Sequence, residues 1–161
     1  MYKLQQNGVK RLLDGASIPN ASGNMDWNEY LSWVDAGGIV LPEYTEEELL
    51  VQAKEAKRNE IRNVFNIESE APVIVGTVSY HGGFDSASKL DGAKRMVETA
   101  GGTEVTFFDV DNLPHVLTLA EATTVILTIG ADYQTKFATK QAKMVQVENA
   151  TTILEVENVS A

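Results

Sequence analysis

Residues 118–149, TLAEATTVILTIGADYQTKFATKQAKMVQVEN, carry the longest helical pattern in the chain. Thr118 and Glu121 lie three residues apart at its start, which is the spacing of a helix capping box. Apolar side chains then recur at steps of mostly three and four residues, namely Leu119, Ala122, Ile126, Ile129, Tyr133, Phe137, Met144 and Val147. This stretch predicts one helix of roughly 30 residues, against a usual mean near 12.

Shorter elements precede the long helix. In chain order they are a β-segment at 73–75, a second at 77–80, a helix from Ser86 or Ser88 to Thr99, a strand at 103–110 and a short strand at 115–117. Residues 151–161 fit either a returning strand or a continuation of the helix, and both alternatives stay open. Together these elements predict a small α/β arrangement.

A second helix is predicted from Thr45, which forms a capping box with Glu48, to about Phe65. Its apolar stripe is thin and is interrupted by Lys57. A polar helix with so narrow an apolar face often bridges two modules instead of filling a core. We therefore expect it to link the two halves of the chain.

The first 44 residues predict a strand or hairpin followed by a short helix. Asn7-Gly8 can form the hairpin turn, and Asn24 or Asp26 can cap a helix that ends near Ala36. The helix carries an aromatic cluster, for which two interpretations stay open: a small core shared with Tyr2 and Leu4, or an anchor for a protein partner. The cluster consists of Trp27, Tyr30 and Trp33.

The predicted fold class is therefore α+β. We expect an N-terminal docking module at residues 1–44, a linking helix at 45–65 and a C-terminal α+β domain at 66–161 with a long C-terminal helix.

Composition excludes several classes of function. The chain has 161 residues, 13 basic and 23 acidic side chains and no cysteine. Disulfides and thiolate chemistry are therefore absent, and the formal net charge of −10 argues against general nucleic-acid binding. The sequence also predicts neither a secretory signal nor a membrane-spanning segment.

No arrangement of residues points to catalysis. His81 and His115 are the two histidines, and a metal site with Asp85, Asp109 or Asp111 lacks helical ligand spacing. Motifs of serine hydrolases and of nucleotide-binding loops are missing. We therefore expect no enzyme activity, no cofactor and no metal.

Two stretches resemble bacteriophage proteins. The first contains Asp14-Gly15-Ala16-Ser17-Ile18-Pro19 and the run Asn24-Met25-Asp26-Trp27-Asn28-Glu29-Tyr30-Leu31-Ser32-Trp33, and it resembles the opening of small tail and tail-fibre-associated proteins. The second, residues 54–148, is similar to a domain of unknown function common in phage tail proteins. It carries Phe84-Asp85-Ser86, Gly92-Ala93, Asp111-Asn112 and Leu117-Thr118-Leu119-Ala120-Glu121.

The resemblance implies a structural tail component, associated with the tail fibre or baseplate, that acts through protein–protein contacts and serves host attachment. The alternative is a tail-fibre assembly chaperone that is absent from the mature virion. The expected partners are other tail proteins and further copies of the chain, with a trimer favoured. The expected location is the virion tail, after synthesis in the host bacterial cytoplasm.

Overall fold

The computed structural model describes residues 1–161, which form two compact units, Met1–Val51 and Gln52–Ala161. The fold is α+β with a long helix near the C-terminus, which confirms the predicted class. The observed division falls at residue 51, inside the predicted linking helix, and so differs from the expected boundaries at 44 and 65.

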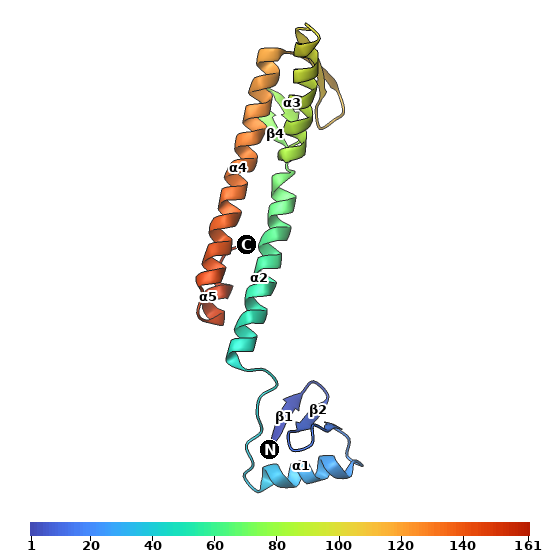
Figure 1. The fold of residues 1–161 in the computed structure, drawn as a ribbon, viewed down its shortest axis with the longest axis vertical. Helices are drawn as coiled ribbons and strands as arrows, with labels where there is room; N and C mark the ends of the chain where they lie inside the picture. The colour runs from blue at the N-terminus through green and yellow to red at the C-terminus, as the bar shows by residue number, and fades with distance from the viewer. The chain divides into compact units, whose positions relative to one another are not determined.

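The first unit is a three-stranded antiparallel sheet with one helix. Its elements, three of which are labelled in Figure 1, are β1 (Tyr2–Gln5), β2 (Gly8–Arg11), β3 (Ser17–Pro19) and α1 (Met25–Asp35). β2 lies between β1 and β3. The hairpin pairs Gln5 with Gly8, so Gln6 and Asn7 form the turn, and the predicted Asn7-Gly8 turn is wrong by one residue. β3 was not predicted.

Of the two caps that the sequence left open, Asn24 and Asp26, the structure uses Asn24. The Asn24 side chain accepts a hydrogen bond from the Trp27 amide at 3.2 Å, which satisfies one free donor of the first turn of α1. The core of the unit consists of Tyr2, Val9, Ile18 and Tyr30, with Trp27, Trp33 and Val40 packed against it.

Gly8 is required where β2 meets β3. Its φ is +151°, and a Cβ there would lie 2.0 Å from the Ile18 carbonyl oxygen. We expect Gly8→Ala to destabilise the first unit by about 2 kcal/mol, since the strained conformation and the backbone clash act together. Thermal unfolding with Gly23→Ala as control checks this, because a Cβ at Gly23 meets nothing within 4 Å. Equal stability of the two variants would show that β2 and β3 do not pair as described.

The second unit combines two antiparallel hairpins with helices (Figure 1). Its elements are the larger part of α2 (Glu46–Ser69), β4 (Val73–Val75), β5 (Val78–Tyr80), α3 (Gly83–Thr99), β6 (Glu104–Phe108), β7 (Pro114–Thr118), α4 (Leu119–Asn149) and α5 (Ile153–Glu157). Relative to the predictions, α2 ends four residues later and α3 begins at Gly83 instead of Ser86 or Ser88. The tail is a separate short helix, which neither open alternative described.

Both predicted capping boxes are present. The Thr45 amide donates to Glu48 Oε2 at 2.8 Å and the Thr45 hydroxyl accepts from the Glu48 amide at 3.1 Å. Thr118 and Glu121 make the same reciprocal pair at the start of α4. These local bonds fix where α2 and α4 begin.

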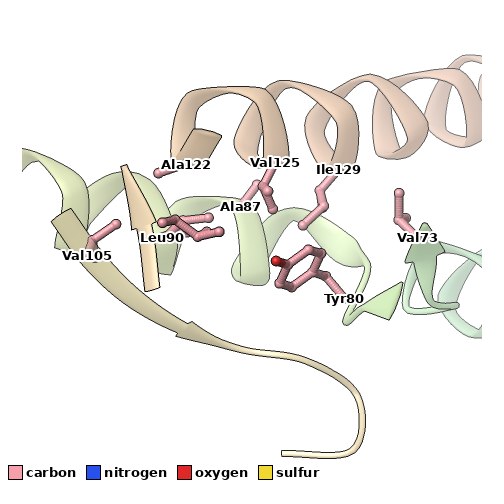
Figure 2. Close-up of a cluster of buried hydrophobic side chains, with 9 residues drawn as sticks. Val73, Tyr80, Ala87, Leu90, Val105, Ala122, Val125 and Ile129 are labelled. Atoms are coloured by element: carbon pink, nitrogen blue, oxygen red, sulfur yellow. The ribbon is translucent and has the colours of Figure 1, made fainter. Parts of the chain in front are cut away.

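The main core of the second unit lies where α3 and both hairpins meet α4. Figure 2 shows Val125 and Ile129 pointing from α4 toward Tyr80 and the start of α3. Leu90, Ala122 and Ile129 have no exposed surface. Burial of this apolar cluster is the main stabilising contribution in the unit.

A second contact holds α2 beside the C-terminal half of α4. Ile61 packs with Val147 and Val159, the Phe65 ring lies 5.8 Å from the Tyr133 ring, and Arg58 pairs with Glu148. The thin apolar stripe of α2 is thus used within the second unit.

Candidate functional site

An apolar groove lies between α3 and α4 in the second unit. Its volume is about 540 Å³, and its lining residues are Phe84, Ala87, Ser88, Asp91, Ile126, Leu127, Gly130, Ala131, Tyr133 and Gln134. Phe84 and Leu127 are 60% and 66% exposed. Apolar side chains of this size that gather at a hollow commonly mark a contact with another molecule.

The turn before α3 positions Phe84 at one end of this groove. Gly82 packs so closely that a Cβ would lie 2.1 Å from the Ala71 carbonyl oxygen, and Gly83 has φ +89°. These glycines allow the chain to pass from β5 directly into α3. The Phe84 ring then lies 5.8 Å from the Tyr133 ring of α4.

The groove is nearly free of charge. Asp91 is the one ionisable carboxylate among its lining residues, and it pairs with Arg95 at 2.8 Å. The lining from α4 is made of apolar, small or amide side chains. The groove is therefore suited to packing against an uncharged protein surface and offers no donor set for a metal or phosphate.

The structure brings the predicted aromatic cluster together. Tyr30 is buried, while Trp27 and Trp33 are half-buried beside it. Tyr2 joins them, with its ring centroid 5.1 Å from Tyr30 and 5.0 Å from Trp33. These contacts favour the core interpretation, although Leu4, which was also expected in this core, is 40% exposed.

A separate polar cluster lies on the β6–β7 hairpin. Asp109 is buried, and one of its oxygens accepts from the amides of Asp111 and Leu113 at 3.0 and 2.8 Å. Its other oxygen lies 2.8 Å from His115 Nε2. The His115 bond, followed by these amide bonds, holds the pKa of Asp109 below its usual range.

Tyr80 completes this cluster. Its ring centroid is 5.8 Å from that of His115, and burial, with smaller effects of the Asp109 and Glu121 charges, raises its pKa. No group of three or more His, Asp or Glu side chains is placed to hold a metal. The Asp109–His115 pair instead closes the turn between β6 and β7.

The Asp109 carboxylate should make the hairpin sensitive to acid. Its pKa is lowered on folding, so its stabilising effect is complete above the ordinary aspartate pKa near 4 and is lost as the pH falls below it. We expect Asp109→Asn to lower stability at pH 7 and to flatten the decline below about pH 4. Thermal unfolding across pH checks this, with Asp85→Asn as the control at a carboxylate that is 81% exposed. If the stability of Asp109→Asn falls with pH as that of the wild type does, the acid sensitivity comes from other groups.

Comparison with known proteins gives one family. Residues 52–161 match the domain of unknown function DUF4376, and the first matched residue is also the first residue of the second compact unit. Searches of curated proteins and of solved structures found no match. None of the helices is both long and apolar enough to cross a membrane.

Proposed function

The chain belongs to the family of the domain of unknown function DUF4376, and we propose that it is a structural component of a bacteriophage or prophage tail. It lies in or next to the tail fibre or baseplate, acts through protein–protein contacts and contributes to host attachment. Its place of synthesis is the host bacterial cytoplasm and its place of action is the virion tail.

The observation that carries the contact-based part of the proposal is the groove between α3 and α4. Phe84 and Leu127 remain exposed beside a charge-poor hollow of about 540 Å³. Solvated surfaces usually avoid such apolar patches, and protein interfaces use them. The tail location rests on the resemblance of the first 40 residues and of residues 54–148 to tail proteins.

The proposed role is not enzymatic. The Asp109 carboxylate accepts hydrogen bonds from two backbone amides of the hairpin turn, and His115 is bonded to the other Asp109 oxygen. Asp91 is paired with Arg95. A role in protein–protein contact depends on the shape of the surface and does not require these side chains to take part in a reaction.

The proposed partners are other tail proteins and further copies of the chain, with three copies favoured. Tail fibres are generally three-fold, so the resemblance supports this number. Nucleic acid is not among the partners, because the net charge is −10 and would oppose binding to phosphates.

Deletion of the coding sequence from a phage that encodes the chain tests this function. We expect particles with filled heads that adsorb poorly to the host, and recovery of adsorption when the chain is supplied from a plasmid. Normal adsorption by the deletion particles would contradict a role in the tail. An assembly chaperone would give the same defect. The protein composition of the mature particle distinguishes the two roles, because a chaperone would be absent from it.

A further inference from the structure

The charges of α4 are distributed in an unusual way. Between Ala122 and Val147 the charged side chains are Asp132, Lys136, Lys140 and Lys143, and all four are half-buried. Every exposed side chain in the same stretch is uncharged. A helix whose outer face stays in water normally shows the opposite arrangement.

The half-buried charges have a structural explanation. Lys136 pairs with Asp132 at 2.6 Å, and Lys140 lies 4.6 Å from the centre of the Phe65 ring of α2. Lys136, Lys140 and Lys143 line the seam between α2 and α4 together with Glu68. Between Ala122 and Val147 the charges of α4 thus serve contacts inside the second unit, and the exposed positions of this stretch carry none.

This outer face has the spacing of a helix-packing surface. Seven exposed positions alternate at steps of three and four residues, and we call them the α4 stripe: Thr124, Leu127, Ala131, Gln134, Ala138, Gln141 and Val145. The spacing is the heptad pattern of a coiled-coil seam, and it extends over about 32 Å. Leu127, Ala131 and Gln134 also line the groove, so the stripe and the groove form one continuous surface.

We propose that copies of this chain associate through the α4 stripe, with the stripe of one copy packed against the stripe of another. This inference rests on the proposed function and names the partner at its site. A second helix with the same spacing can pack on this stripe, since its side chains enter the spaces between those of the first.

Charge places the contact between two copies of the chain at the stripe. The chain carries a net charge of −10, so most of its surface opposes a second copy. The α4 stripe is uncharged, and two copies can meet there without placing carboxylates opposite one another. A partner recruited by its own charge would find no group of opposite sign along the stripe.

A nearly isosteric substitution tests this association. Gln134→Glu with Gln141→Glu adds two charges to the stripe with almost no change of shape. We expect light scattering to give an oligomer for the wild type, and the double variant to dissociate with a Kd raised about tenfold or more, because like charges would be buried together. Its circular dichroism should stay unchanged.

The matched control is Gln52→Glu with Gln146→Glu, which makes the same two changes at exposed positions outside the stripe. The control should associate like the wild type. A wild type that stays monomeric at high micromolar concentration, or a stripe variant that associates like the control, overturns the inference. Either result would leave the tail location standing, since that depends on particle composition.

Labelling of a single thiol gives a second measurement, which does not depend on whether the two stripes pack in parallel or antiparallel orientation. The chain has no cysteine, so Ala138→Cys introduces one reactive group in the stripe and Gln146→Cys introduces one outside it. We expect maleimide labelling at position 138 to slow at concentrations where the oligomer forms, and labelling at 146 to stay constant. Equal rates at position 138 at low and high concentration would contradict packing through the stripe.

Discussion

Ile129→Ala is expected to lower the free energy of unfolding of the second unit by about 3–4 kcal/mol, the usual cost of truncating a large buried side chain. Ile129 has no exposed surface and lies in the main core between α4, Tyr80 and α3 (Figure 2). Truncation would leave a cavity that rigid helices on both sides cannot close. Chemical denaturation followed by circular dichroism measures the change.

Leu127→Ala provides the matched control for this prediction. Leu127 is two residues away on the same helix, but it is 66% exposed and belongs to the α4 stripe. Its truncation should change the stability of the monomer by less than about 0.5 kcal/mol. It should instead weaken self-association. A large loss of monomer stability from Leu127→Ala would contradict the exposed position of Leu127 on α4.

Trp27→Ala combined with Trp33→Ala is expected to destabilise the first unit by about 3–5 kcal/mol, enough to unfold so small a core. Both indoles pack against the core, where Trp33 lies 5.0 Å from the Tyr2 ring and Trp27 lies 4.9 Å from the Tyr30 ring. Gly38 also packs against Trp33, since a Cβ there would lie 2.3 Å from the indole.

Hydrogen exchange of the full chain distinguishes the two interpretations of this cluster. We expect protection to be lost in residues 1–51 and kept in residues 52–161, whereas Met25→Ala, at an 86% exposed position of α1, should change neither. Normal protection of the double variant together with lost attachment to the tail would instead support the interpretation of Trp27 and Trp33 as interface anchors. Normal protection together with normal attachment to the tail would contradict both interpretations of the cluster.

Local sequence signals predicted where α2 and α4 begin. The capping pairs Thr45–Glu48 and Thr118–Glu121 are both formed. The predicted apolar face of α4 is also confirmed, because Ala122, Ile129 and Val147 are fully buried. These features depend on residues within one or two turns, which a single sequence contains.

Features that depend on distant residues were not predicted. β3 is a three-residue strand that exists through pairing with β2. α5 is a different case, because its capping box of Thr152 and Glu155 is a local signal that was not recognised. The sequence of α4 contains two stripes of helical spacing, and only packing against α2, α3 and the hairpins determines which one stays exposed. The groove likewise requires α3 and α4 to be placed side by side.

Mass spectrometry of gradient-purified virions tests the central claim most directly. The phage or prophage particles should come from a strain that encodes this chain, with the crude lysate measured in parallel. We expect peptides from residues 1–51 and from 52–161 in the particles, in constant proportion to known tail proteins. A chain that is abundant in the lysate and absent from mature particles would contradict the structural role and identify an assembly chaperone instead.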